Sequence, residues 1–362
     1  MKVSEFDFDL PAELIAQDAV ERGASRLLVV DRASGELSHA VVRELPRFLR
    51  AGDLLVTNDT RVFPARLLGH RVPSGGAVEC LLLHRGARDV EPGAGDAERG
   101  TRAPEEWDAL MHPGQKLKPG ARVVFERDGR TLHGEVLERL FHGRRRIRLE
   151  AESGTVADAI DAIGHIPLPP YIHRADTAAD RERYQTVYAA HRGSIAAPTA
   201  GLHFDAPLLA AIDAAGVERT SLTLHVGYGT FKPVRVDDVE AHVVDPEPYE
   251  IAAPAAGAIN AALDQGRRVI AVGTTTTRAL EHAGARGGGR VVAGRGVADL
   301  FIHPGFAFRV TRGLLTNFHL PKSSLLMLVS ALAGRERVLH AYREAVARRY
   351  RFYSYGDAML VV

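Results

Sequence analysis

A block of short strand-like patterns between Ala65 and Glu150 interrupts the chain, and it constrains the fold more than any other feature. Within it, apolar stretches such as AVECLLL and TLHGEVLE alternate with Gly, Pro and charged turns, at the spacing typical of a small barrel or sandwich. Helical periods appear only after Gly154. We therefore predict a mixed α/β (α+β) main domain from residues 1–64 together with 151–362, and an inserted all-β barrel-like domain over residues 65–150.

Two further features of the insert bear on its surface and its chemistry. The stretch from Gly86 to Glu105 is rich in glycine and acidic residues, so it cannot bury enough apolar surface to order itself, and we expect a surface loop. Cys80 lies in an apolar strand pattern and is expected to be a core residue. Because it is the only cysteine, the chain has no intrachain disulfide and no cysteine-based zinc or iron–sulfur site.

Charge and hydropathy limit the partners and the compartment. The net charge of +1 creates no long-range electrostatic attraction for nucleic acid, so any polyanion must be held by a local basic patch. The first residues, MKVSEFDFDLP, lack the basic-then-apolar layout of a signal peptide. The longest apolar run, Leu325 to Ala333, is too short to span a bilayer. We expect a cytoplasmic protein without a membrane partner.

Irregular polar segments recur along the main domain, and their residues suit a binding site better than a core. Such segments have no helical or strand period, which indicates that their backbone surrounds a bound molecule instead of maximising burial. Six of them spread over one chain predict a single enzyme site assembled from many loops. The six are GSIAAPTAGLHF (193–204), TNDTR (57–61), LHVGYGTF (224–231), VGTTTTR (272–278), LLTNFHLPKSSLL (314–326) and SYGDAML (354–360).

These segments, together with FDFDLPAELIAQ, RLLVVDR, GHIPLPPYI and DRERYQTVYA, closely resemble the S-adenosylmethionine:tRNA ribosyltransferase-isomerase family of queuosine biosynthesis. The likeness runs in order over nearly the whole chain. One departure is the run Val244 to Glu247, where the family usually shows Met-His-Ser/Ala-Glu; a histidine is therefore missing, and only Glu247 is a candidate there.

The resemblance implies a reaction in which S-adenosylmethionine donates its ribosyl group. The acceptor is 7-aminomethyl-7-deazaguanine at the wobble position of tRNA, the product is epoxyqueuosine, and adenine and methionine leave. Such a site needs a general base, an acid for the departing adenine and groups that hold the methionine part. S-adenosylmethionine is consumed as a substrate, so no cofactor and no metal are expected. The resemblance also favours a monomer.

Histidines in the polar loops are the first candidates for proton transfer. His203 and His225 follow apolar residues in Gly- and Thr-rich loops, and imidazole titrates near neutral pH, so we predict them as base and acid. The alternative is a core histidine that is satisfied by backbone carbonyls. His319 lies in TNFHLP with Asn317, and both are predicted to bind substrate, although His319 is also compatible with a structured turn.

Residues next to predicted strands are candidates for holding substrate. Asp59 directly follows a strand and is predicted to be catalytic, by binding an ammonium group, while Arg61 would bind a carboxylate or phosphate. An Asx-turn with an internal Asp–Arg pair is the alternative. Further candidates for substrate binding are Thr199 in the Thr-Ala-Gly step, Thr274, Thr275 and Arg278 at a helix start that suits an anion, and Tyr355 and Asp357 before the last strand. Plain N-capping by Thr274, and a strand-entry turn at Asp357, remain open.

Four residues are predicted to bind tRNA. Lys322 begins an apolar helix, where the helix dipole disfavours a cation, so we expect a negative group nearby, such as a tRNA phosphate. Alternation places Arg144 and Arg146 on one strand face, where they would neutralise phosphates or protect an edge strand. Tyr171 is predicted to stack on a splayed anticodon base.

Two other functions compete with this interpretation. An S-adenosylmethionine-dependent RNA methyltransferase would use the same donor, but no Gly-rich loop of the dinucleotide-binding kind follows the first strand. A non-catalytic RNA-binding protein fits the barrel-like insert, but less well the neutral charge and the His, Thr and Asp residues in loops.

Overall fold

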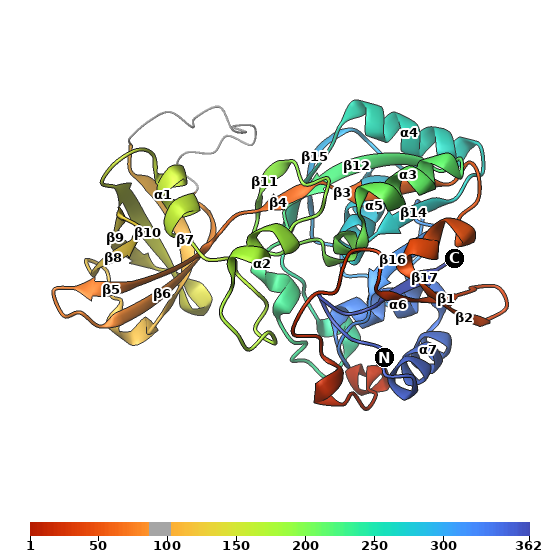
Figure 1. Ribbon diagram of the computed structural model, residues 1–362, viewed down its shortest axis with the longest axis horizontal. Helices are drawn as coiled ribbons and strands as arrows, with labels where there is room; N and C mark the ends of the chain where they lie inside the picture. The colour runs from red at the N-terminus through yellow and green to blue at the C-terminus, as the bar shows by residue number, and fades with distance from the viewer. Residues whose placement is uncertain (87–102) are drawn as a thin grey trace. The chain divides into compact units, whose positions relative to one another are not determined.

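The computed structural model describes residues 1–86 and 103–362 and divides the chain into two compact units (Figure 1). The first unit holds both chain ends and comprises Met1–Arg61, Pro169–Arg174 and Arg181–Val362. The second comprises Val62–Leu168 and Ala175–Asp180. Most of the surface loop expected at Gly86–Glu105, residues 87–102, lies outside the described residues.

A nine-stranded mixed sheet forms the centre of the first unit. Its four adjacent strands β12, β3, β14 and β16 are parallel, and the remaining strands extend the sheet on both sides. Strands β3 and β16 are buried along their whole length, as expected for parallel strands covered on both faces. The order is β15 (Gly294–Ala298), β13 (Glu247–Ile251), β12 (Glu218–Leu224), β3 (Leu54–Asn58), β14 (Val269–Val272), β16 (Gly313–Asn317), β17 (Ala358–Val361), β1 (Arg26–Val30) and β2 (Leu37–Val41).

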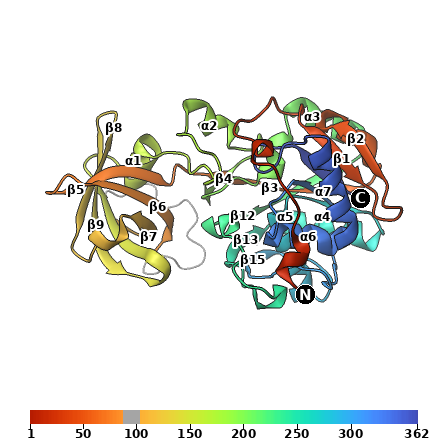
Figure 2. The same cartoon turned by 90° about the horizontal axis from the view of Figure 1, so that it is seen from below.

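Helices cover both faces of this sheet because its strands are apolar on both sides. One face packs against α4 (Ala253–Asp264), α5 (Thr274–Arg286), α6 (Ser324–Ala333) and α7 (Arg335–Ala347), as Figure 2 shows from below. The other face packs against α3 (Ala206–Ala214) and the 3-10 helices η3 (Val42–Phe48) and η6 (Thr199–His203). Leu54 and Val56 belong to the first core, whereas their neighbour Leu55 belongs to the second, so alternation along β3 assigns each side chain to a face.

The second unit is built around a closed six-stranded antiparallel barrel. Apolar residues that alternate along the strands fill its interior, including Cys80, which is fully buried as predicted. Helix α1 (Val156–Ile163) packs its apolar face on the barrel strands, so it belongs to this unit and not to the sheet. The barrel order is β10 (Arg144–Ala151), β7 (Glu105–His112), β6 (Ala77–Arg85), β5 (Arg66–Val72), β8 (Arg122–Arg127) and β9 (Arg130–Arg139).

This architecture confirms the predicted fold class, a mixed α/β body with an all-β barrel inserted in the chain. The two remaining strands, β4 (Thr60–Val62) and β11 (His191–Ser194), pair as a small separate sheet, and α2 (Ala178–Arg183) lies between the barrel segment and β11 in the chain. Among the described residues, no helix is long and apolar enough to cross a bilayer.

One edge of the large sheet collects the polar loops. The carboxyl ends of β12, β3, β14 and β16 share this edge because these strands are parallel. Strands β1 and β17 begin there, since Ala358 pairs with both Asn317 and Leu27. In open α/β sheets, ligands bind at the carboxyl ends of strands, so this edge is the candidate site.

Candidate functional site

His225 follows β12, and a chain of hydroxyl groups fixes one side of its ring. The Val226 N–H donates to Ser194 Oγ at 2.8 Å, and Ser194 Oγ lies 2.8 Å from Thr60 Oγ1. Thr60 Oγ1 in turn lies 2.8 Å from Nδ1 of His225. Ser194 and Thr60 are fully buried, so each hydroxyl must donate to be satisfied. The Thr60 hydroxyl has two acceptors within reach, His225 Nδ1 and the His191 carbonyl at 3.4 Å, so these contacts fix the position of the His225 ring and not which nitrogen carries its proton.

Gly193 lets the backbone of β11 pass directly over the His225 ring. A Cβ atom at this position would lie 2.6 Å from Cε1 and 2.7 Å from Nδ1 of His225. No real Cβ approaches a ring this closely, so only glycine fits. The small residue that opens GSIAAPTAGLHF therefore has a packing role against the candidate histidine.

Asp59 is bound by its neighbouring strand. Its carboxylate accepts a hydrogen bond from Ser221 Oγ at 2.8 Å and another from Thr223 Oγ1 at 2.6 Å, both on β12. The internal pair with Arg61, which was the alternative interpretation, is absent from the described contacts: Arg61 is exposed on β4, and its side chain has no described partner. Asp59 thus anchors the loop to β12, while Arg61 is available to a ligand.

Arg278 and Glu247 form a buried ion pair that ties several loops together. Glu247 Oε2 accepts from Arg278 Nη1 at 2.5 Å, and Oε1 accepts from the Gly227 N–H at 3.0 Å. Arg278 also donates to the carbonyls of Leu300, Ala298 and Asp245 at 3.1, 2.8 and 3.2 Å. Protein acceptors thus engage all three nitrogen atoms of Arg278, and the residue holds the loop that follows His225; its substrate contact stays a prediction.

The Thr-rich segment opens helix α5. Gly273, with a φ of 93°, is the N-cap, so Thr274 is the first helical residue and not the cap. Thr276 and Thr277 donate their hydroxyls back to the carbonyls of Val272 and Gly273, at 2.6 and 3.1 Å. Thr274 and Thr275 make no such bond, and they lie buried at the helix start, where free N–H groups favour an anion.

His203 ends η6 and is held by Asn317. Asn317 Nδ2 donates to the carbonyls of Tyr353 and Ser354 at 3.1 and 3.4 Å, which fixes the orientation of the amide, and it lies 3.2 Å from His203 Nε2. Nε2 must therefore accept, and the neutral ring carries its proton on Nδ1. Burial, followed by the charges of nearby arginines, lowers the pKa of His203 to about 4.

Two histidines thus depart from the expectation that site imidazoles titrate near neutral pH. His203 stays neutral there, and so does His319, whose pKa burial lowers to about 3. Nε2 of His319 lies 2.9 Å from Thr316 Oγ1, and the backbone N–H of His319 donates to Tyr342 Oη at 3.0 Å. His319 therefore sits in a structured turn, as the alternative interpretation held.

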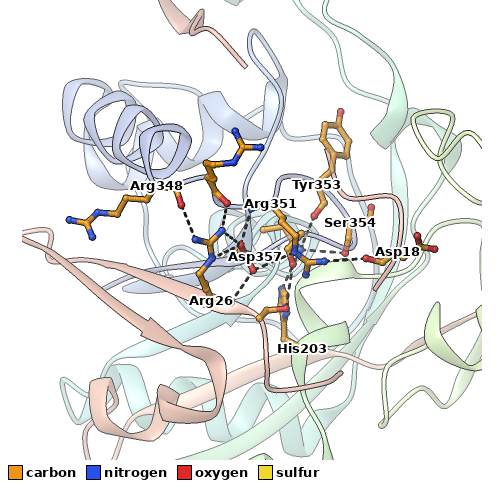
Figure 3. A network of polar contacts seen from close by, with 12 residues as sticks. Asp18, Arg26, His203, Arg348, Arg351, Tyr353, Ser354 and Asp357 are labelled. Atoms are coloured by element: carbon orange, nitrogen blue, oxygen red, sulfur yellow. Dashed lines mark hydrogen bonds and ion pairs between the residues drawn. The ribbon is translucent and has the colours of Figure 1, made fainter. Parts of the chain in front are cut away.

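Asp357 is a buried carboxylate that organises the entry to β17 (Figure 3). It accepts from the backbone N–H groups of Arg26 and Arg351 at 2.9 and 2.8 Å, and it pairs with the Arg26 guanidinium at 3.1 Å. These contacts support the alternative of a strand-entry turn, and the substrate contact of Asp357 stays a prediction. Tyr355 is also buried, with its ring edge-on to Tyr184 at 6.0 Å between centroids.

The four predicted tRNA contacts have protein partners. Lys322 Nζ lies 2.6 Å from Asp7, so the expected negative group is a carboxylate of the chain. Tyr171 packs on Tyr353 with 3.8 Å between ring centroids, and its hydroxyl bonds to Ser354, which leaves its ring poorly placed to stack on a base.

Arg144 and Arg146 share the outer face of β10 as predicted, but β10 pairs with both β7 and β9 and is no edge strand. Arg146 forms an ion pair with Asp108 at 3.0 Å. The edge-strand alternative is therefore wrong, because the barrel is closed.

The structure brings most predicted site residues to one sheet edge, and it adds others. Asn317 ends β16 at this edge, and Thr199 begins η6, whose other end is His203. The residues that follow strands ending there are Asp59, His225, Thr274, Thr275 and His319. Sequence analysis passed over Thr60, Gly193, Ser194 and Ser354, although each lies in or next to a segment recognised as irregular. Among residues 1–86 and 103–362, no group of three or more His, Cys, Asp or Glu side chains is arranged to hold a metal ion.

Comparison with known proteins places the chain in a family. A family model described as queuosine biosynthesis protein matches residues 3–361. Two relatives are the S-adenosylmethionine:tRNA ribosyltransferase-isomerases of Symbiobacterium thermophilum and Desulfitobacterium hafniense. They are 52% and 49% identical to this chain, and each match covers 100% of both chains. The crystal structure of an S-adenosylmethionine tRNA ribosyltransferase from Thermotoga maritima is 35% identical, with a TM-score of 0.53, and the match covers 99% of this chain and 100% of that one. These matches confirm the resemblance, and the chain belongs to the queuosine biosynthesis protein family.

Proposed function

We propose that this protein transfers and isomerises the ribosyl moiety of S-adenosylmethionine onto 7-aminomethyl-7-deazaguanine at the tRNA wobble position. The product is epoxyqueuosine, and adenine and methionine are released. The observation that carries the proposal is the full-length match to relatives named S-adenosylmethionine:tRNA ribosyltransferase-isomerase, at about half of all positions identical. S-adenosylmethionine is then a substrate, and we propose no cofactor and no metal. We further propose that the enzyme acts as a monomer in the cytoplasm, on tRNA.

The contacts at the sheet edge support distinct roles for the candidate residues. His225 is the first candidate for the acid that protonates the departing adenine, because Thr60 fixes the position of its ring through Nδ1. His203 is proposed as a neutral donor through Nδ1. Thr274 and Thr275 at the start of α5 are proposed to hold the methionine carboxylate. Thr199, Asn317, His319, Tyr355 and the exposed Arg61 remain proposed substrate contacts.

The direct test is a mass-spectrometric assay with S-adenosylmethionine and tRNA that carries the aminomethyl-deazaguanine. Release of adenine and methionine, with a ribosyl-derived mass added to the tRNA, would support the proposal. Release of S-adenosylhomocysteine would instead identify an RNA methyltransferase. tRNA binding without any turnover by folded protein would favour a non-catalytic RNA-binding protein.

A further inference from the structure

Three arginines from separate segments surround the end of η6. Arg22 donates from Nη1 to the carbonyl of Leu202 at 2.8 Å, directly before His203. Arg183, the last residue of α2, donates from Nη2 to the carbonyl of Val20. Arg351 precedes β17 and donates from Nη1 to the carbonyl of Asp18 at 3.3 Å, and Figure 3 shows its side chain between Asp18 and His203 in that view. All three side chains therefore converge near the segment 18–23 and His203.

The described contacts of these guanidinium groups orient them without neutralising them. Arg22 and Arg183 donate only to backbone carbonyls, and neither forms an ion pair with a described residue. Arg351 has one carboxylate nearby, Asp357 at 3.9 Å, but Arg26 holds that carboxylate at 3.1 Å. In addition, Nη2 of Arg351 is buried and makes no hydrogen bond. Arg351 therefore has no close counter-charge of its own among the described residues.

Other carboxylates near the cluster are exposed or already bound. Asp18 pairs with Arg174 at 3.0 Å, and Asp205 accepts from the Leu208 N–H at 2.8 Å as the N-cap of α3. Glu182 is exposed, and its charge acts on Arg22 together with that of Asp205. At His203 itself, the charges that most affect the ring are those of Arg351, Arg183 and Arg22, and all three lower its pKa. The field beside His203 is thus positive.

We propose that Arg183 and Arg351, supported by Arg22, bind a phosphate of the substrate RNA strand beside His203. The planar guanidinium fork matches the geometry of two phosphate oxygens. Guanidinium groups that lie close together repel one another, and a bound phosphodiester would offset that repulsion. The site would position the strand whose base reacts, because phosphate contacts set register and orientation. This inference rests on the proposed function, since it takes its ligand from the proposed tRNA substrate.

The test compares tRNA binding by the wild type, Arg183→Gln and Arg183→Lys across a range of salt concentrations, without S-adenosylmethionine. Arg183→Gln should weaken tRNA binding by about tenfold and reduce the slope of log Kd against log salt by about 0.7–0.9. Arg183→Lys should keep the slope but lose part of the affinity, since it keeps the charge and loses the fork. Arg343→Gln is the matched control: Arg343 is exposed on α7 without a described partner, and its loss changes the net charge equally.

The outcomes separate this inference from the proposed function. Unchanged tRNA affinity and salt slope in folded Arg183→Gln would overturn the phosphate site, even if the wild type releases adenine normally. A raised KM for S-adenosylmethionine with unchanged tRNA binding would assign the arginines to the methionine carboxylate instead, and would also overturn it. If Arg351→Gln is made as well, its circular dichroism and melting curve must match the wild type before its affinity is interpreted. Failure of the wild type to release adenine would count against the proposed function alone.

Discussion

Thr60 Oγ1 lies 2.8 Å from Nδ1 of His225, and this contact joins the small β4–β11 sheet to the histidine at the end of β12. Ser194, on the other strand of that small sheet, completes the connection through its own hydroxyl, 2.8 Å from Thr60. The orientation of His225 thus depends on residues that lie far from it in the chain. A side chain locked in this way has little freedom to lose when substrate binds.

Replacing Thr60 by valine should lower kcat by about tenfold to hundredfold, because the isosteric side chain removes the partner of His225 Nδ1. The pH dependence of kcat should change as well, since the ring would lose its hydrogen-bond partner at Nδ1. Thr60→Ser keeps a hydroxyl at the same place and should retain most activity. Adenine release over a range of pH measures both effects, and equal loss in the serine and valine variants would point to packing instead.

Gly193→Ala should reduce activity by about hundredfold, since its Cβ would lie 2.6 Å from the His225 ring and displace it. The matched control is Gly257→Ala in the exposed middle of α4, where nothing lies within 4 Å of the added Cβ. That change should leave activity intact and stabilise the protein by about 0.5–1 kcal/mol, because alanine loses less backbone freedom in a helix. Activity assays and urea unfolding of both variants test the pair.

The strands and the loops at their ends could be predicted from the sequence. Alternation, glycine turns and apolar runs indicated the barrel and the sheet, and parallel strands bring their carboxyl ends to one edge. Asp59 was predicted to line a site for this reason, and His225 and Asn317 from the irregular polar loops that hold them; all three lie at that edge. Local pattern suffices where neighbouring strands place the loops.

The partners of individual side chains could not be predicted from the sequence, because they depend on contacts between distant segments. Arg278 was expected to face substrate, yet Glu247 lies 31 positions away in the chain and binds it. Thr60 was passed over beside Asp59, since no period within a loop tells which side chain faces His225. Lys322 was expected to meet a negative group, but nothing in its own segment identifies Asp7.

Loss of the Glu247–Arg278 pair should destabilise the fold. In Glu247→Ala the guanidinium of Arg278 stays buried without its counter-charge, so the free energy of unfolding should fall by about 3–5 kcal/mol. Glu250→Ala on the same strand is the control: its partner Arg295 is 3.0 Å away, but both side chains are about half exposed, so the loss should stay below about 1 kcal/mol. Urea unfolding measures both, and equal losses would contradict a special role for the buried pair.

His203 should make the protein less stable as the pH falls below neutrality. Its pKa in the folded protein is about 4, against an ordinary value of 6.5, so between these values the unfolded chain binds a proton that the native state does not. The free energy of unfolding should therefore fall as the pH drops from about 6.5 to about 4, by roughly 3 kcal/mol for this group.

His203→Gln stays neutral throughout, so its stability should depend less on pH than that of the wild type. The contribution of His319, whose pKa is also lowered, is common to both proteins and cancels in the difference. Urea unfolding at a series of pH values checks this, and parallel curves for the two proteins would mean that His203 is protonated as easily in the folded state as in the unfolded one.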